Sequence, residues 1–350
     1  MRIAMVAPLI ESVPPALYGG TERVVSVLTE ELVRRGHDVT LFASGESRTS
    51  ARLFPCAERA LRSDPDVHDT VAYTLIEMGE VYARSQDFDI IHNHNDYLGF
   101  SFARLSTTPT VTTTHGRLDL SEVQRIYGYY AEQRLVSISH DQRSWLPKAN
   151  WVGTVHNAID LDNYHLREEP GDYLVFLGRI SPEKRPDRAI EIARDVGMRL
   201  LIAAKVDAVD QAYFEHAIEP LIRRNRGLVE FIGEVDERGK DELLGNAYAY
   251  LFPVDWPEPF GLTMAEAMAT GTPVIATRNG SVPEVVADGR TGFVCDTLAG
   301  MIEAVQRVGE IDRRACREHV ERHFSPAAMA DGYEQIYERV VAEGARPGPA

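Results

Sequence analysis

The sequence lacks a dense cysteine pattern, a long apolar run and a basic cluster, and each absence excludes a class of protein. The three cysteines, Cys56, Cys295 and Cys316, are far apart and odd in number, which fits a reducing compartment better than a disulfide framework or a zinc site. No apolar stretch approaches the roughly 18 residues of a membrane-spanning helix, and the chain begins on a strand pattern without a signal peptide. These features predict a cytoplasmic protein without a transmembrane segment.

The charge balance and the glycine pattern exclude further classes. The net charge is -16 and the sequence has no long basic run, so we expect no nucleic acid partner, because binding to a phosphate backbone requires basic surface. The glycine motifs of dinucleotide dehydrogenases and of P-loop nucleotide hydrolases are both missing. The 350 residues, of which 44% are hydrophobic, are sufficient for two domains with separate cores.

Short strand patterns alternate with amphipathic helical stretches along the chain, which is typical of parallel sheets with crossover helices. In the first half we expect helices over 21–35 and about 71–85. The strand patterns of this half cover 2–8, 38–44, 89–94, 110–116, 135–140 and 151–157. Those of the second half cover 173–180, 199–206, 228–235, 248–254, 272–277 and 291–296. The predicted fold class is α/β, with two Rossmann-like domains.

A polar stretch at 166–172 separates the two sets of strands, and we place the domain boundary there. The predicted domains are an N-terminal Rossmann-like domain over 1–168 and a C-terminal one over 169–325. In the segment 326–350, a last helix to about residue 343 has no following strand and is expected to pack across the domain junction. The rest of this segment is predicted to be a flexible tail.

Candidate binding residues follow strand ends, where open α/β sheets bind their ligands. In the first half, Gly19 and Gly20 precede a helix, whose free backbone N–H groups can hold an anion. The alternative is a plain turn. In the second half, Arg179 and Lys184 follow a strand end and are placed to clamp a diphosphate. The alternative is that both are solvated surface charges.

Two glutamates flank a loop-to-helix junction in the segment EPFGLTMAEAMATGTPVIA, which begins at Glu258. Glu258 follows the apolar pattern 248–254 and is expected at the carboxyl end of that strand. Glu266 lies further on, in the predicted helix. Because Thr263 and Glu266 have the Thr-x-x-Glu spacing of a capping box, a purely structural role for Glu266 stays open.

Four segments in this order resemble the retaining glycosyltransferases of family 4, which have the GT-B fold of two Rossmann-like domains facing across a cleft. The segments are YGGTERVV from Tyr18, TTTHG from Thr112, GRISPEK from Gly178 and the E-x7-E segment from Glu258, which GSVPEVV and GRTGFV follow. The resemblance covers nearly the whole chain. It implies a retaining hexosyltransferase that moves a sugar from a nucleoside-diphosphate sugar to a hydroxyl acceptor, which the N-terminal domain binds. UDP is the expected nucleotide, because it is the most frequent one in the family.

The resemblance also implies the roles of single residues. Glu258 would hold hydroxyls of the donor sugar and Glu266 those of the ribose, while Arg179 and Lys184 would neutralise the leaving diphosphate. The implied catalytic residues are His115, Glu258, Arg179 and Lys184. The further donor-binding residues are Gly19, Gly20, Val235, Phe260, Gly261, Leu262, Thr263 and Glu266. Val235 ends the segment 231–235, which is expected to line the base pocket. The family needs no cofactor and no metal, because cationic side chains supply the positive charge at the diphosphate.

Three patterns are compatible with a metal instead. The triplets at 87–89 and 160–162 have the Asp-x-Asp form of the metal-dependent glycosyltransferase fold, but such triplets are frequent in an acidic chain. His92 and His94 are predicted to lie on one face of a strand, at a spacing that two metal ligands can use. Because no third ligand follows, we favour a packing or acceptor-side role for both histidines.

The chain departs from the family pattern in two loops. Arg185 and Pro186 replace the glycine that usually follows the clamp lysine, and NAID from Asn157 replaces the common Asn-Gly-Val-Asp. Neither change removes a catalytic group. Arg313, outside all of these motifs, is expected on the surface.

Other functions stay open at this stage. A nucleotide-sugar 2-epimerase or a phosphorylase would share the fold, and a non-catalytic subunit that binds nucleotide sugars is the alternative from another class. The epimerase requires acid and base carboxylates of its own, and the phosphorylase a lysine for pyridoxal phosphate that the sequence does not identify. The subunit would have no reason to keep His115, Arg179, Lys184 and Glu258 together.

Overall fold

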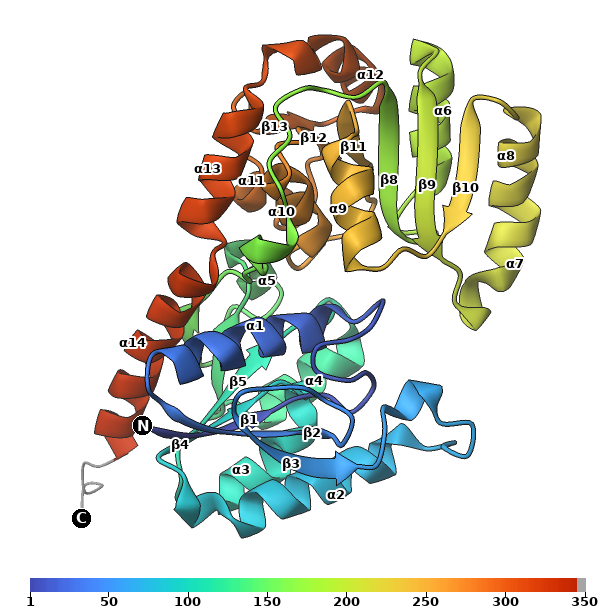
Figure 1. Ribbon diagram of the computed structural model, residues 1–350. Coiled ribbons are helices and arrows are strands. Elements are labelled where there is room, and N and C mark those ends of the chain that lie inside the picture. The colour runs from blue at the N-terminus through green and yellow to red at the C-terminus, as the bar shows by residue number, and fades with distance from the viewer. Residues whose placement is uncertain (345–350) are drawn as a thin grey trace. The chain divides into compact units, whose positions relative to one another are not determined.

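The computed structural model describes residues 1–344, and the chain divides into two compact units (Figure 1). The first unit comprises Met1–Ala158 and the C-terminal helix α14 (Pro326–Gly344), and the second comprises Ile159–Ser325. Helix α14 is the helix predicted from about residue 326 to 343. Of the predicted tail, residues 345–350 lie outside the described residues. None of the described helices is both long and apolar enough to cross a bilayer.

The first unit is built on a parallel sheet of seven strands in the order β3-β2-β1-β4-β5-β6-β7. The strands are β1 (Arg2–Val6), β2 (Asp38–Ser44), β3 (Arg52–Ala57), β4 (Ile90–Asn93), β5 (Thr110–Thr114), β6 (Arg134–Ser137) and β7 (Trp151–Thr154). The helices of this unit besides α14 are α1 (Gly20–Arg34), α2 (Thr70–Ala83), α3 (Phe100–Leu105), α4 (Ser121–Tyr129) and α5 (His140–Ser144). Short 3-10 turns are η1 (Leu61–Ser63), η2 (Ser85–Asp87) and η3 (Asp96–Gly99).

Strand β3 is the one strand of this sheet that the sequence patterns do not predict. It pairs with β2 at the sheet edge, with a register shift between Ala43 and Ser44, and none of its residues is fully buried. Pro55, which has no N–H to donate, is tolerated there because an edge strand has one unpaired side. The segment RLFPCA is apolar, but a proline within a run argues against a strand, which explains why the pattern is missed.

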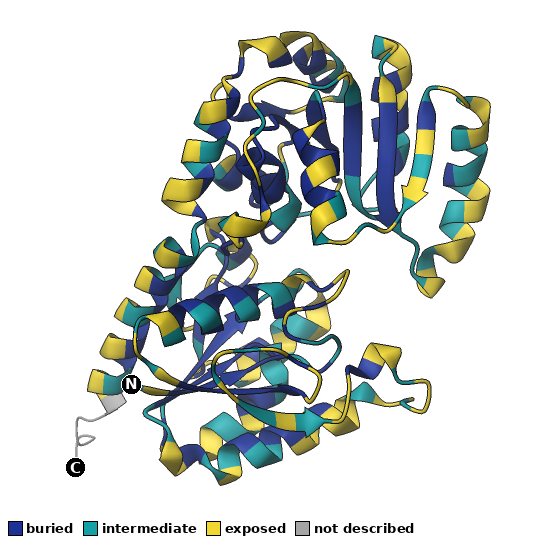
Figure 2. Cartoon of the chain, viewed as in Figure 1, coloured by how far each residue is buried: buried dark blue, intermediate teal, exposed yellow. Residues whose placement is uncertain are grey.

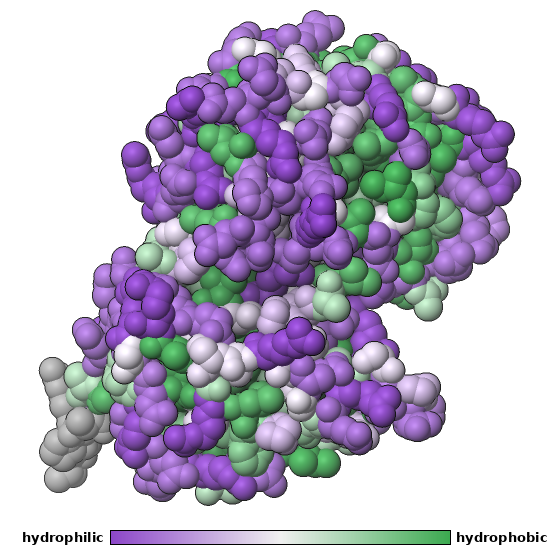
Figure 3. All heavy atoms as spheres, in the orientation of Figure 1, coloured by the Kyte–Doolittle hydropathy of each residue, from purple (hydrophilic) through white to green (hydrophobic). Residues whose placement is uncertain are grey.

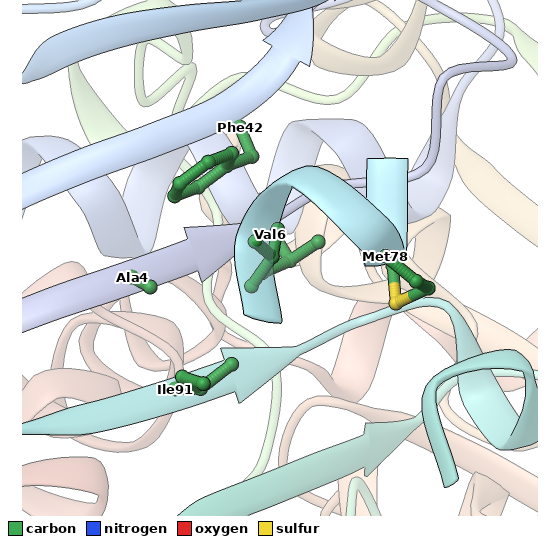
Figure 4. Packing of buried hydrophobic residues seen from close by; sticks show 6 residues of the cluster. Ala4, Val6, Phe42, Met78 and Ile91 are labelled. Carbon is green, nitrogen blue, oxygen red and sulfur yellow. The ribbon is translucent and has the colours of Figure 1, made fainter. Parts of the chain in front are cut away.

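The core of the first unit lies where the central strands meet α2. Val6 of β1, Phe42 of β2 and Ile91 of β4 are fully buried and share a cluster with Met78 of α2 (Figure 4). Strands buried on both faces appear as continuous apolar runs, which explains why β1, β2 and β4 are recognisable from sequence. This packing fixes the strand ends from which the binding loops of the first unit start.

Helix α14 closes the first unit and contacts α1 and β7. Arg35, directly after α1, forms ion pairs with Asp331 at 2.7 Å and with Glu334 at 2.6 Å. Glu334 also lies 2.8 Å from Nε2 of His37. Gly153 of β7 provides the space for Ile336, because a Cβ at this position would lie 2.6 Å from the Ile336 Cδ1 atom.

The second unit contains a parallel sheet of six strands in the order β10-β9-β8-β11-β12-β13. The strands are β8 (Tyr173–Arg179), β9 (Arg199–Lys205), β10 (Val229–Gly233), β11 (Ala249–Phe252), β12 (Val274–Thr277) and β13 (Gly292–Cys295). The helices are α6 (Pro186–Val196), α7 (Gln211–Tyr213), α8 (Glu219–Arg224), α9 (Glu237–Gly245), α10 (Leu262–Ala269), α11 (Val282–Val285), α12 (Leu298–Arg307) and α13 (Arg313–His323). Shorter turns are η4 (Leu161–Asn163), η5 (Ala208–Asp210), the π-helical η6 (Phe214–Ile218) and η7 (Val308–Glu310). The prediction of two Rossmann-like domains with parallel sheets is confirmed.

Burial in the second unit follows the layers of the fold, with dark strands between helices that are exposed on one side (Figure 2). Strand β10 is less covered. Its Phe231 packs on Phe214 at a centroid distance of 5.2 Å, whereas the next residue, Ile232, is 37% exposed. Apolar side chains gather over β8, β9 and β10 on the face drawn in Figure 3.

Both sheets reverse their strand order beside the first strand of the unit. In the first unit β1 lies between β2 and β4, and in the second β8 lies between β9 and β11. Loops that leave neighbouring strands in opposite directions open a crevice at such a switch point, and ligands of doubly wound sheets bind there. The residues after β1, β4, β8 and β11 are therefore the candidates for function.

Candidate functional site

Lys184 and Glu258 meet at the switch point of the second unit. Lys184 lies in the loop after β8 and Glu258 in the loop after β11, and the Lys184 ammonium forms an ion pair with Oε2 of Glu258. The same oxygen accepts a hydrogen bond from Nε1 of Trp256 at 2.9 Å. The ammonium also lies near the rings of Phe252 and Trp256, at 5.6 and 5.1 Å from their centroids. The structure thus brings together a cation and a carboxylate that the sequence assigns to one site.

Arg179 ends strand β8 and is held among carboxylates. Its guanidinium lies 2.9 Å from Glu183, 3.6 Å from Asp207 and 3.6 Å from Asp210. The side chain is 26% exposed, so solvent reaches it despite these contacts. The acidic neighbours fix the position of the guanidinium at the strand end. They are not visible as partners in the sequence, because Asp207 and Asp210 follow a different strand, β9.

Arg185, which takes the place of the family glycine, has a left-handed backbone with φ 55° and ψ 51°. This conformation is costly for a residue with a Cβ and is the one that glycine adopts freely. The Arg185 guanidinium lies 2.8 Å from Asp187 and 2.8 Å from Asp255. Although Arg185 replaces the family glycine, the backbone between Lys184 and α6 therefore still makes a left-handed turn.

The loop after Glu258 turns into helix α10 at Gly261, which has a left-handed φ of 76°. Phe260 is 2% exposed and packs against Phe324, so its side chain belongs to the core and only its backbone is available to a ligand. Leu262 and Thr263 are partly exposed at the helix start, and the Thr263 hydroxyl lies 2.7 Å from that of Tyr250.

The segment at Gly280 and Ser281 supports this loop, a role that the sequence interpretation does not contain. Ser281 donates its backbone N–H to the Glu258 carbonyl at 2.9 Å and its hydroxyl to the Phe260 carbonyl at 2.9 Å. Gly280 lies so close that a Cβ would be 2.3 Å from the Glu258 nitrogen. A glycine followed by a small hydroxyl residue in GSVPEVV is the signal that points to this close approach.

The capping box of Thr263 and Glu266 does not form. The residue before the first helical residue is Gly261, without a side-chain cap, so Thr263 and Glu266 lie too far into α10 for the box geometry. Glu266 is 2% exposed and accepts a hydrogen bond at 2.8 Å from the ammonium of Lys240 in α9. The capping-box interpretation of Glu266 is therefore wrong. Val235, also assigned to the donor site, is partly buried after β10.

In the first unit, the glycine loop leads from β1 into α1 as predicted. Gly19 is the residue before the helix and Gly20 its first residue. A Cβ on Gly19 would lie 2.7 Å from Pro15, so the close approach requires glycine there. Glu22 follows in the first turn, 5% exposed, and burial raises its pKa to about 7. The sequence interpretation does not single out Glu22, although it is part of YGGTER.

His115 and His94 meet at the ends of β5 and β4. Nε2 of His115 lies 2.8 Å from Nδ1 of His94. Burial lowers the pKa of His115 to about 4, so this imidazole is neutral near pH 7. Asp96 accepts a hydrogen bond from the His115 backbone at 3.3 Å, has a left-handed φ of 46°, and has its pKa raised to about 6 by burial. Strain and shifted titration together are typical of functional positions.

His92 has a packing role. Its two ring nitrogens lie 2.6 Å from the Tyr337 hydroxyl of α14 and 2.7 Å from the Thr113 hydroxyl. The ring centroids of His92 and His94 lie 4.0 Å apart, and His94 in turn contacts His115.

The two metal-compatible triplets are engaged elsewhere. Asp89 pairs with Arg2, and Asp160 caps η4. Among residues 1–344 no group of three or more His, Cys, Asp or Glu side chains is arranged to hold a metal.

Arg313 does not lie on the surface as expected. It is 6% exposed, and its guanidinium donates to the carbonyls of Arg167, Ala247 and Gly245. A buried guanidinium that meets several carbonyls at once stabilises the packing of α13, which is a structural role.

Comparisons with known proteins cover nearly the whole chain. Residues 18–163 match the family model described as Glycosyltransferase Family 4, and residues 160–315 match that of Glycosyl transferases group 1. The chain is 26% identical to phosphatidyl-myo-inositol mannosyltransferase from Mycobacterium leprae, with 99% of each chain covered.

Two solved structures are similar to this chain over their full length. Sucrose-phosphate synthase from Thermosynechococcus elongatus has a TM-score of 0.79 at 21% identity, with 98% of this chain and 100% of that chain covered. HepE from Anabaena, in complex with UDP and glucose, has a TM-score of 0.75 at 16% identity, with the same coverage. At these identities the likeness to solved structures shows the fold.

Proposed function

We propose that this chain, which belongs to the glycosyltransferases of family 4 and has the GT-B fold, is a retaining hexosyltransferase that uses a nucleoside-diphosphate sugar. The observation that carries this proposal is the meeting of Lys184 and Glu258 at the switch point of the second unit, with Arg179 at the end of the same strand β8. A cation pair suits a diphosphate, and a carboxylate suits sugar hydroxyls. The site therefore has separate groups for both parts of the donor.

In the proposed reaction, the bond between the anomeric carbon and the diphosphate oxygen breaks, and the acceptor oxygen forms the new bond on the same face. The acceptor proton passes to an oxygen of the leaving diphosphate, so no protein nucleophile is required. Charge grows on the diphosphate as the bond breaks, and preorganised cations stabilise it most at that moment. This is the role that we assign to Arg179 and Lys184.

The remaining residues complete the donor site of the proposal. Glu258 accepts hydrogen bonds from sugar hydroxyls, and Glu266 from ribose hydroxyls. The backbone of Phe260, Gly261, Leu262 and Thr263 supplies N–H groups at the start of α10, and Val235 lies beside the base. In the first unit, we assign Gly19 and Gly20 to donor binding and His115 to catalysis, as the family resemblance implies. The acceptor is also assigned to that unit.

UDP is the nucleotide that we favour. The support is that HepE, with the same fold, binds UDP and UDP-glucose in its structures. We also propose that the reaction needs no metal, because Arg179 and Lys184 supply the positive charge. Activity should then survive EDTA. Complete loss in EDTA with recovery in manganese or magnesium would contradict this part of the proposal.

A thermal-shift screen of UDP, GDP and ADP and their sugars tests the donor assignment. A ligand at about 100 times its Kd adds about 2.7 kcal/mol to the free energy of unfolding, which is a measurable rise in Tm. Slow hydrolysis of the best donor without acceptor then separates an enzyme from a subunit that only binds. An equilibrium between two epimers of the free nucleotide sugar would identify the 2-epimerase instead. Absence of any shift would overturn the donor site.

A further inference from the structure

Lys240 is a buried lysine beside Glu266, and its contacts set it apart from the clamp cations. It extends from α9, is 8% exposed, and reaches Oε1 of Glu266 at 2.8 Å and Oε1 of Glu237 at 2.6 Å. Its third contact is the Tyr164 hydroxyl at 3.1 Å. Glu266 and the Tyr164 hydroxyl accept hydrogen bonds from the ammonium, whereas Glu237 forms an ion pair with it.

These contacts direct Lys240 toward protein groups. Its ammonium meets Glu266, Glu237 and Tyr164, and its side chain is 10% exposed. Arg179, by comparison, is 26% exposed at the end of a strand. Of the three groups that Lys240 contacts, Glu266 is the one that the proposed function assigns to the ligand, so we consider how Lys240 acts through Glu266.

Stability alone is a weak reason for this arrangement. Buried ion pairs can often be replaced by apolar residues of similar size without loss of stability, because desolvation offsets their attraction. What a buried pair does achieve is to hold a charged side chain in one state and one orientation. Glu266 is 2% exposed in α10, the helix that begins at the Glu258 loop.

We propose that Lys240 is a positioning residue that keeps the Glu266 carboxylate ionised and oriented to accept hydrogen bonds from the ribose hydroxyls of the donor nucleotide. This inference rests on the proposed function, in which Glu266 binds the ribose. An ionised carboxylate is an acceptor only, so both of its oxygens suit hydroxyl donors. A neighbouring cation favours that form over the protonated acid.

Glu237 and Tyr164 in turn hold the Lys240 side chain in place. The Tyr164 hydroxyl donates to Oε2 of Glu237 at 3.2 Å, so the three groups form a closed ring of contacts. The contacts with Glu237 and Tyr164 thus hold the end of the long, flexible lysine side chain in one position. The recognition of ribose thus depends on a residue that is predicted not to touch the ligand.

The test compares binding of nucleotides with and without ribose hydroxyls. The probes are UDP, GDP and ADP with their 2′,3′-dideoxy counterparts, titrated by calorimetry into the full chain. We expect the wild type to prefer the ribose form by roughly 10- to 100-fold, the range of hydrogen bonds to a charged group. Lys240→Met, like Glu266→Gln, should reduce this preference to within about threefold and leave affinity for the dideoxy form unchanged.

Further variants keep the test decisive. Lys240→Arg should recover part of the preference, and Lys148→Met, the same exchange at an exposed lysine of the first unit, should keep all of it. Should Lys240→Met not fold, as judged by circular dichroism, Lys240→Gln and Tyr164→Phe serve the same comparison, the second with a partial loss.

The outcomes separate this inference from the proposed function. A lost preference in Glu266→Gln but a wild-type preference in Lys240→Met would overturn the role of Lys240 alone. Equal weakening of both nucleotide forms in Lys240→Met would show a structural role and also overturn it. If the wild type binds none of the nucleotides, the proposed function fails, and this inference fails with it.

Discussion

The Lys184 ammonium is in ion-pair contact with the Glu258 carboxylate, although the two residues follow different strands, β8 and β11. Their side chains are 16% and 10% exposed, so each neutralises the other in a largely desolvated position. In the proposed function the two groups contact different parts of the donor, the diphosphate and the sugar. On this proposal the pair links the stability of the second unit to its activity, and mutation can separate the two effects.

Lys184→Met should lower both the free energy of unfolding and kcat/KM. We expect a loss of about 2 to 3 kcal/mol in stability, because Glu258 keeps a poorly solvated charge without its cation. Adding Glu258→Gln should restore most of this stability, since a neutral amide can still accept from Trp256. Chemical denaturation measures the first effect. The kinetic loss should stay at about 100-fold or more in both variants, and recovery of activity in the double variant would refute the catalytic role.

Arg179→Ala should lower kcat/KM by about 100-fold, with part of the loss in kcat, because the charge that it stabilises grows in the transition state. Arg179→Lys should recover only part, since an ammonium cannot reproduce the planar fork of donors. Arg194→Ala, which removes an exposed arginine of α6, is the matched control and should be near wild type. Steady-state kinetics with the donor identified by the thermal screen decide this. An Arg179→Ala enzyme within a few-fold of wild type would contradict the diphosphate clamp.

Arg185→Gly should be more stable than Arg185→Ala by about 1 kcal/mol. Both remove the contacts to Asp187 and Asp255, but only alanine retains the cost of a left-handed backbone, which exceeds the extra entropy of unfolded glycine. At Arg194, within helix α6, the order should reverse, because glycine is the poorer helix former by about 1 kcal/mol. Urea denaturation of the four variants measures both differences. The same order at both positions would contradict the strain assigned to Arg185.

Parallel strands are the part of the fold that the sequence predicts well. Strands such as β9 and β12 are buried along nearly their whole length, so they appear as short apolar runs between turn residues. The edge strand β3 is only partly buried, and Pro55 within its apolar segment argues against a strand. Local sequence therefore identifies elements to the extent that burial is uniform along them.

Contacts between distant segments explain what the sequence does not predict. The Thr263 and Glu266 spacing fits a capping box, but the left-handed turn at Gly261 decides where α10 begins, and it excludes that box. Lys240 and Glu266 lie in different helices, so their contact depends on how α9 and α10 pack. Arg313 has no local signal of burial, because the carbonyls that it meets come from other segments. The motifs indicated which strand ends the candidate residues follow, whereas the partners that these residues contact could not be predicted.

The last prediction concerns acid stability and His115. Burial lowers the folded-state pKa of His115 to about 4, below the ordinary value of about 6.5, so folding favours the neutral ring. This contribution is complete above about pH 6.5 and is lost as the pH falls toward 4. The raised pKa values of Asp96, about 6, and Glu22, about 7, act with the opposite sign, so a wild-type profile alone mixes these effects.

The variant His115→Asn isolates the contribution of the histidine. Between pH 7 and pH 4 the wild type should lose up to about 3 kcal/mol relative to this variant, an upper value because His115 as a residue is only partly buried. Urea denaturation at several pH values measures the difference, with His68→Asn, at an exposed histidine, as the control whose difference should stay constant. Parallel profiles for wild type and His115→Asn would show that His115 is not held neutral by the fold.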